Sequence, residues 1–105
     1  MKLLLSTSPD RDAERIARAL LDEKLIACAN LVAGVRSLYW WKGAVERSDE
    51  TILVMKTTDE LAGRAVERLK ELHPYEVPEA VLLDITGGWP PYLAWIAEST
   101  AGAAG

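Results

Sequence analysis

The chain has 105 residues, of which 50% are hydrophobic and 27% are charged, and its formal net charge is −4 at pH 7. This length and balance are typical of one globular domain. Acidic residues outnumber basic ones by 16 to 12, so the sequence lacks the basic surface that nucleic acids and anionic membranes attract. It also lacks a run of about 20 apolar residues that could cross a bilayer. We therefore expect neither nucleic acid nor a membrane as a partner.

The first predicted elements are a strand and a helix. Residues 2–6 form a short apolar run that is typical of a strand. Ser8 is suited to cap the helix that follows, and Pro9 is suited to its first position. Beyond them, apolar side chains recur at the three- and four-residue spacing of one helix face, at Ala13, Ile16, Ala17, Leu20 and Leu21.

Residues 25–57 predict a long β-hairpin. Its expected pieces are a strand, a turn or bulge, a further extended stretch, a turn and a second strand, at residues 25–32, 33–34, 35–41, 42–43 and 51–56. Tyr39, Trp40 and Trp41 then lie near the tip of the hairpin.

A second helix is predicted after the hairpin. Thr57 and Glu60 have the spacing of a capping box, with Thr57 as the cap. Apolar residues share one stripe as far as Leu72, and Pro74 ends the helix because a residue before proline is disfavoured in the helical conformation. A strand, a short helix and a frayed tail are expected to follow, at residues 80–86, 91–99 and 101–105.

The resulting order is β-α-β-β-α-β with a short C-terminal helix. This order predicts an α+β fold of the ferredoxin-like, split βαβ type, in which an antiparallel sheet carries both main helices on one face. Residues 1–100 are expected to form a single domain, and residues 101–105 a flexible tail.

The predicted strands are apolar on both sides. Ile52 and Val54 alternate with Leu53 and Met55, so only one of these pairs can face the two helices. A bare apolar sheet face is a large exposed patch, which soluble monomers avoid. We therefore expect other copies of the chain to cover it.

Cys28 is the only cysteine, and it lies between two alanines. An intrachain disulfide is therefore excluded, and a reducing cytoplasm is the expected location. Cys28 and His73 have the chemistry of a nucleophilic pair, but a cysteine among small apolar neighbours is more often a buried, inert thiol. Hydrolase and P-loop motifs are absent, so we expect no enzymatic activity and no catalytic residue.

The stretch Leu-His-Pro-Tyr-Glu-Val-Pro-Glu at residues 72–79 contains the only histidine. His73, Glu76 and Glu79 offer an imidazole and two carboxylates, a donor set suited to Cu(II). A structural zinc site would need four Cys or His ligands, and the chain has one of each. Alternatively, His73 follows Leu69 by four residues on the apolar stripe and packs at the end of the helix.

The aromatic pair near the hairpin tip also has two interpretations. Trp40 and Trp41 are consecutive, so strand alternation points them to opposite sides. One can join the core while the other packs against a partner subunit. Ligand stacking is the alternative, and four charged residues would either add charge to such a pocket or form a solvated edge: Lys42, Glu46, Glu50 and Lys56.

Five blocks of the sequence occur in a distinctive order. They read Leu-Ile-Ala-Cys-Ala-Asn-Leu-Val, Ser-Leu-Tyr-Trp-Trp-Lys-Gly, Lys-Thr-Thr, His-Pro-Tyr-Glu-Val-Pro-Glu and Tyr-Leu-Ala-Trp, at residues 25–32, 37–43, 56–58, 73–79 and 92–95. In this combination they resemble the CutA divalent-cation tolerance family. The resemblance runs from the first strand to Trp95, which is nearly the whole chain.

The resemblance implies a homotrimer of ferredoxin-like subunits in the bacterial cytoplasm, with a role in tolerance to copper and other divalent cations. It implies no enzymatic reaction and no required cofactor, and Cu(II) or another divalent cation is the expected metal. His73 matches the histidine of the family's His-Pro-Tyr-Glu block. Leu72 and Ser6 stand where some members have a further histidine and a cysteine. Metal binding is therefore expected to be weak, through His73, Glu76 and Cys28.

A second function hypothesis is a small-molecule sensor similar to the PII-type nitrogen regulators in fold and assembly. Its ligand would lie between subunits, in a pocket near Trp40, Lys56, Tyr75 and Glu76. A hydrolase and an RNA-binding module are not favoured. Nothing in the sequence orients His73 as a base, and the chain has no phenylalanine and no basic block.

Overall fold

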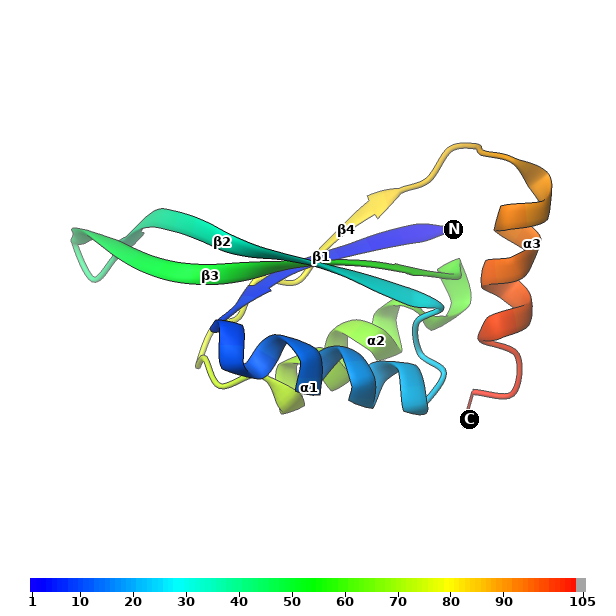
Figure 1. Ribbon diagram of the computed structural model, residues 1–105, viewed down its shortest axis with the longest axis horizontal. Coiled ribbons are helices and arrows are strands. Elements are labelled where there is room, and N and C mark those ends of the chain that lie inside the picture. The colour runs from blue at the N-terminus through cyan, green and yellow to red at the C-terminus, as the bar shows by residue number, and fades with distance from the viewer. Residues whose placement is uncertain (104–105) are drawn as a thin grey trace.

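The chain folds as one antiparallel sheet with two helices on one of its faces (Figure 1). The computed structural model describes residues 1–103. The strand order is β2-β3-β1-β4, and α3 stands at the end of the sheet opposite the hairpin tip. This arrangement confirms the predicted ferredoxin-like α+β fold. The elements are β1 (Lys2–Ser8), α1 (Asp10–Asp22), β2 (Cys28–Trp41), β3 (Ala44–Thr57), α2 (Asp59–Leu72), β4 (Val81–Asp84) and α3 (Pro90–Ser99).

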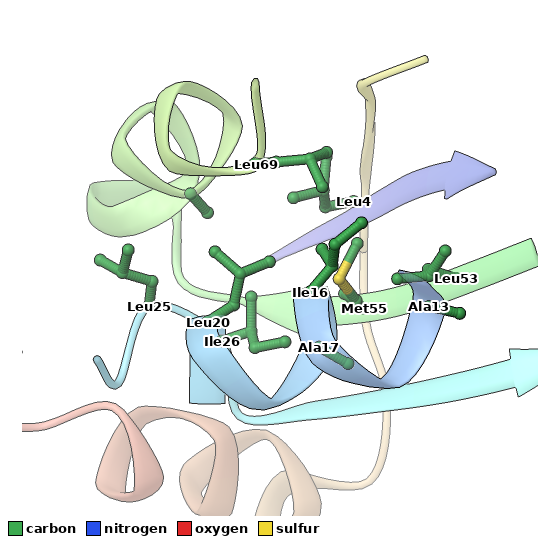
Figure 2. Packing of buried hydrophobic residues seen from close by; sticks show 11 residues of the cluster. Leu4, Ala13, Ile16, Ala17, Leu20, Leu25, Ile26, Leu53, Met55 and Leu69 are labelled. Carbon is green, nitrogen blue, oxygen red and sulfur yellow. The ribbon is translucent and has the colours of Figure 1, made fainter. Parts of the chain in front are cut away.

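The core lies between the two main helices and one face of the sheet (Figure 2). Strand alternation selects that face, because Leu53 and Met55 are fully buried while Ile52 and Val54 remain partly exposed. The helices contribute the buried residues of their predicted stripes, namely Ala13, Ile16, Ala17 and Leu20 from α1 and Ala62, Ala65 and Leu69 from α2. Within residues 1–103, no helix is both long and apolar enough to span a bilayer.

The hairpin formed by β2 and β3 ends and turns where predicted, but its second strand is longer than predicted. Each strand has 14 residues, and the tip projects well beyond β1 and β4 (Figure 1). We predicted the second strand from residue 51, but β3 begins at Ala44, since backbone pairing continues to the turn through polar residues. We predicted the first strand from residue 25, but β2 begins at Cys28. The preceding residues, 25–27, are buried in the connection from α1.

Three residues with positive φ angles shape this hairpin, two in its turn and one in its bulge. Lys42 and Gly43 have φ angles of 50° and 82°, as in the two-residue turns whose twist matches that of the flanking strands. Gly34 has a φ angle of 78° and lies where the pairing register shifts between Val32 and Val35. The predicted turn and bulge are both confirmed.

The caps of the two main helices differ from the prediction. At α2 the cap is Thr58, whose hydroxyl accepts a hydrogen bond from the backbone amide three residues later at 3.3 Å. Thr57, our predicted cap, is the last residue of β3, is buried, and donates to the carbonyl of Leu25 at 2.7 Å. At α1 the cap position belongs to Pro9. The predicted cap, Ser8, faces inward at the end of β1 and donates to the Pro9 carbonyl instead.

The end of α2 agrees with the prediction. Leu72 is its last residue, and His73 is extended, with φ −81° and ψ 139°, as the residue before a proline prefers. β4 was predicted over residues 80–86 and is shorter, because only residues 81–84 pair with β1.

The C-terminal helix α3 is close to its predicted range. It runs over Pro90–Ser99, and its cap residue Thr100 donates to the carbonyls of Ile96 and Ala97. Of the predicted flexible tail, Ala104 and Gly105 lie outside the described residues.

The sheet face opposite the helices is largely apolar, and the described elements leave most of it uncovered, since α3 reaches only the end that carries Lys56. Val54 lies opposite Leu5 of β1, and Leu5 lies opposite Val81 of β4, so these side chains form one row across the sheet. Leu3 and Leu83 form the next row. Val81 and Leu83 are both 47% exposed. We call this surface, centred on these five residues, the open face.

The hairpin tip is also uncovered. We expected one of the two consecutive tryptophans in the core, but Trp40 is 75% exposed and Trp41 is 41% exposed. The prediction was wrong because the tip extends past both helices, so neither side of it meets the core (Figure 1). Leu38 and Val45 share this exposure, at 70% and 59%.

Candidate functional site

An open groove of about 790 Å³ lies between the hairpin and the connector that follows α2. Segments far apart in the sequence form it: the end of β1, the outer half of β2, one residue of β3 and the connector 74–79. Its lining consists of Thr7, Ser37, Leu38, Tyr39, Trp40, Trp41, Glu50, Pro74, Tyr75, Glu76, Val77 and Glu79. The groove therefore contains most of the conspicuous block at residues 73–79.

His73 fixes the start of this connector. The residue is 8% exposed, and its Nδ1 accepts a hydrogen bond from the backbone amide of Tyr75 at 3.1 Å. In the neutral ring the proton is then on Nε2, which donates to the carbonyl of Thr7 at 2.7 Å. Both ring nitrogens are thus engaged within the chain. The interpretation of His73 as a residue packed at the helix end is confirmed.

Tyr75 joins the connector to β3. Its hydroxyl donates to Oε2 of Glu50 at 2.7 Å, and its ring lies 4.7 Å from that of His73. Burial and this hydrogen bond to a carboxylate raise the pKa of Tyr75 well above its ordinary value, because both disfavour the phenolate. Tyr75 is therefore a permanent hydrogen-bond donor to Glu50 at neutral pH.

The groove carries uncompensated negative charge. Glu50 is only 5% exposed, and Glu76 and Glu79 line the same groove. Burial and the negative charge of Glu50 raise the pKa of Glu79 above its ordinary value. Among the described residues, no ion pair is formed by any of the three carboxylates.

The structure brings together three of the four residues of the predicted ligand pocket. Trp40, Tyr75 and Glu76 line the groove, whereas Lys56 lies on the open face towards the other end of the sheet. There its ammonium group donates to Asn30 at 3.3 Å and lies 5.7 Å from the ring centre of Tyr92. Within one chain, Lys56 cannot take part in the groove.

The three predicted metal ligands do not converge within one chain. Cys28 is paired with Lys56, which is opposite Leu3 near the start of β1, whereas His73 bonds to Thr7 near its end. Across residues 1–103, no group of three or more His, Cys, Asp or Glu side chains is arranged to hold a metal ion.

Cys28 is not the buried thiol that its small neighbours indicated. It is half-buried, because β2 turns it towards the open face, and its Sγ lies 3.8 Å from Nζ of Lys56 and 3.7 Å from the hydroxyl of Tyr92. The neighbouring ammonium group disfavours a divalent cation at this thiol within the single chain.

Glu50 is the residue of the groove that the sequence identifies least well. We weighed it only as one of four charges that would either join a pocket or form a solvated edge. Its near-complete burial depends on Tyr75, which is 25 positions away. The only sequence feature that points to Glu50 is its position at the polar end of an alternating strand. This feature is equally typical of a solvated strand edge and of a groove wall.

Comparison with known proteins finds similarity across the whole fold. A protein-family model described as CutA1 divalent ion tolerance protein matches residues 2–99. The divalent-cation tolerance protein CutA of Thermus thermophilus is 44% identical over 100 residues, which cover 94% of this chain and 97% of that protein. The matched residues include the groove, both main helices and α3.

Solved structures show the same similarity. The crystal structure of CutA from Xylella fastidiosa has a TM-score of 0.92 at 40% identity, covering 94% of this chain and 96% of that one. The PII-like protein CutA from Nostoc sp. PCC 7120, in apo form, has a TM-score of 0.91 at 38% identity, with 95% and 97% covered. A structure described as the periplasmic divalent cation tolerance protein CutA from Archaeoglobus fulgidus has a TM-score of 0.91 at 33% identity, with 95% and 99% covered.

Proposed function

Because the chain belongs to the CutA1 divalent ion tolerance protein family, we propose that it acts in divalent-cation tolerance as a non-enzymatic homotrimer. The name of its Thermus thermophilus relative describes tolerance to divalent cations. The observation that carries the assembly is the open face, an apolar surface that the chain's own described elements leave mostly uncovered.

The open face favours association because of its chemistry and its position. It presents one aliphatic row across three neighbouring strands, β3, β1 and β4, and a second row of two leucines from β1 and β4. Soluble monomers rarely leave a contiguous apolar surface of this kind in water. The aromatic hairpin tip gives a second uncovered apolar surface at the opposite end of a molecule that is 44 Å long. Two such surfaces on each subunit suit a closed ring of copies better than a two-fold dimer.

Sedimentation velocity tests the assembly directly. We expect a single species with three times the mass of the chain at micromolar concentration. A monomer at all concentrations would contradict the proposal, and a stable dimer would contradict the trimer alone.

We propose that the protein binds Cu(II) weakly, through His73 and Glu76. To bind a metal, His73 must give up its hydrogen bond to Thr7 or to the amide of Tyr75, and this exchange lowers the apparent affinity. Cys28 would have to come from a neighbouring subunit. Calorimetric titration with Cu(II), comparing the native protein with His73→Gln, tests this, and equal affinities would remove His73 from the site.

A second candidate function is PII-like sensing of a small molecule, and the groove favours it. The groove already contains Trp40, Tyr75 and Glu76, and a neighbouring subunit would have to supply Lys56. A thermal-shift screen with nucleotides and small metabolites distinguishes the two candidates. A shift with a metabolite supports sensing, whereas a shift with copper alone supports the metal hypothesis.

We retain the cytoplasm as the proposed location. The single cysteine has a free, half-buried thiol, which a reducing compartment preserves. The related Archaeoglobus fulgidus structure is described as periplasmic, so the periplasm is the alternative to be tested. Fractionation of cells that produce the protein, with a cytoplasmic and a periplasmic marker enzyme, tests this proposal.

A further inference from the structure

The charge of the groove indicates which class of ligand it can hold. Glu50, Glu76 and Glu79 line it, whereas its lining contains no lysine, arginine or protonated amine. Only 5% of Glu50 is exposed, and the one described hydrogen-bond partner of its carboxylate is the neutral hydroxyl of Tyr75. A buried carboxylate without a counter-ion is costly unless a cation joins it.

Aromatic side chains stand on the same side of the hairpin as Glu50. The pairing register places Val35 opposite Glu50 and Ser37 opposite Ser48, so alternate residues of β2 share the face of Glu50. Tyr39 belongs to this set, and its hydroxyl lies 2.7 Å from that of Ser48.

Trp41 is the next residue of the same set. The ammonium group of Lys42 lies 5.8 Å from the centre of its ring, so a cation reaches this ring in the structure. Tyr75 completes the aromatic lining from the connector.

We propose that this groove binds an organic ammonium compound. The ammonium group would donate hydrogen bonds to Glu50 and Glu79, and its alkyl part would lie against Tyr39, Trp41 and Tyr75. Aromatic rings attract alkylammonium ions through their negative faces, and carboxylates bind the N–H groups by charge-assisted hydrogen bonds. The inference deepens the sensing function and rests on the groove being the ligand site.

A bare divalent metal ion is a poorer match for the same residues. Hard cations need several oxygen atoms converging on one point, and the described residues contain no such group of three ligands. Aromatic walls offer nothing to the water shell of a metal ion, but they do stabilise a weakly hydrated organic cation. The carboxylates and the rings are therefore explained together by an alkylammonium ligand.

Titration with 1,4-diaminobutane, followed by calorimetry on the intact assembly, tests the inference. 1,4-Butanediol serves as the neutral probe of similar length. We expect saturable binding of the diamine and none of the diol, with affinity that falls as salt is raised. Two variants separate charge from aromatic contact: Glu50→Gln keeps an acceptor for Tyr75, and Trp41→Leu keeps all charges.

Each variant should weaken diamine binding about tenfold, the scale of one lost charge-assisted or cation–π contact. The matched control is Glu98→Gln, which removes an equal charge on α3, far from the groove, and should leave binding unchanged. No diamine binding by an intact native assembly, or equal affinity in Glu50→Gln, would overturn the inference. The inference would also be overturned if only the Lys56→Met variant bound the diamine. That result would mean that Lys56 of a neighbouring subunit pairs with the groove carboxylates in the native protein.

The failure of this inference is distinguishable from that of the functions proposed above. The sedimentation profile of the same sample reports assembly, and the metabolite screen reports whether any ligand binds. An intact trimer that responds to a neutral or anionic metabolite, but not to diamines, overturns only the ammonium class.

Discussion

At the scale of single residues, the functional block at residues 73–79 is organised by hydrogen bonds within the chain. His73 ties the connector to Thr7, and Tyr75 ties it to Glu50. These two contacts hold the carboxylates of the groove beside the hairpin. The imidazole therefore has a structural role, and a metal ion could bind it only by replacing one of its hydrogen bonds.

The substitution Tyr75→Phe tests the bond to Glu50. It leaves a buried carboxylate without its donor, so we expect the free energy of unfolding to fall by about 1–3 kcal/mol at neutral pH. Urea denaturation measures the change. Tyr92→Phe is the matched control, because the Tyr92 hydroxyl has only a distant contact with Cys28 at 3.7 Å. Equal losses in the two variants would show that the Glu50 contact has no special weight.

The same residue predicts a loss of stability at high pH. Burial and Glu50 raise the pKa of Tyr75 in the folded chain above the ordinary 10.0. Above about pH 10 the unfolded chain loses this proton while the folded chain keeps it, so unfolding becomes easier as pH rises. Between about pH 9 and about pH 11, the native protein should lose more stability than Tyr75→Phe. Parallel losses would contradict the raised pKa.

The sequence identifies some of these residues but not their partners. The block His-Pro-Tyr-Glu-Val-Pro-Glu stands out through its single histidine and two prolines, and Pro74 correctly ends a helix. The link from Tyr75 to Glu50 depends on where a connector crosses a strand, and no local pattern reports that. Lys56 is an example of a wrong grouping. The sequence assigned it to the ligand pocket, but within one subunit it lies far from the groove in space.

At the scale of elements, local patterns predict the type of each segment better than its ends. The alternation in β3 and most residues of both apolar helix stripes face the core as predicted, but Leu21, the last predicted residue of the α1 stripe, is 37% exposed. The caps were wrong by one residue because an inward-facing strand residue and a helix cap are both suited to threonine or serine. The full length of β3 was missed because residues 46–50 are all polar, and backbone pairing with β2 rather than core burial keeps them in the strand.

The cap of α2 gives a direct test of this scale. Thr58→Ala removes the acceptor for an amide of the first turn, and the free energy of unfolding should fall by about 1 kcal/mol. Thr58→Ser retains the hydroxyl and should recover most of that loss in the same denaturation experiment. If alanine is tolerated without cost, Thr58 does not act as the cap.

Two glycines should respond to alanine with opposite signs. Gly43 has a φ angle of 82° in the hairpin turn, so Gly43→Ala forces an L residue into the left-handed region and should cost about 1 kcal/mol. Gly63 lies inside α2, and Gly63→Ala should raise stability by about 1 kcal/mol. A Cβ at either position meets no atom within 4 Å, so backbone conformation alone decides whether alanine raises or lowers stability. Thermal denaturation of both variants checks this pair, and equal signs would contradict it.

At the scale of the whole molecule, one helix-covered face and one open face give the subunit two unlike sides. On the helix side, α1 and α2 cover the sheet and enclose a core of fully buried aliphatic residues (Figure 2). The open face and the hairpin tip remain apolar and uncovered. This imbalance was foreseen from the alternation of Ile52 and Val54 with Leu53 and Met55, whereas the geometry of assembly has no counterpart in a sequence pattern.

The substitution Val54→Lys tests the proposed role of the open face. Val54 lies at its centre, opposite Leu5, and is only partly buried in the single chain, so a lysine there can reach water in the monomer. In an assembly the same charge would be buried unpaired, at a cost of a few kcal/mol and a loss of about a hundredfold or more in association. Sedimentation should detect smaller species.

Leu21→Lys is the control for this substitution. Leu21 is a 37% exposed leucine on α1, on the helix side of the molecule, and its replacement should leave the sedimentation profile unchanged. Dissociation by both variants would point to general destabilisation, and dissociation by neither would exclude the open face as the contact surface.

The projecting hairpin has a thermodynamic consequence. Near its tip, β2 and β3 pair only with each other within the described chain, so packing in the core contributes little to the stability of the tip. If neighbouring copies supply its remaining contacts, mass action links the order of the tip to the amount of protein present. A melting temperature for this chain would then have a defined meaning only together with a concentration, and dilution alone would loosen the walls of the groove.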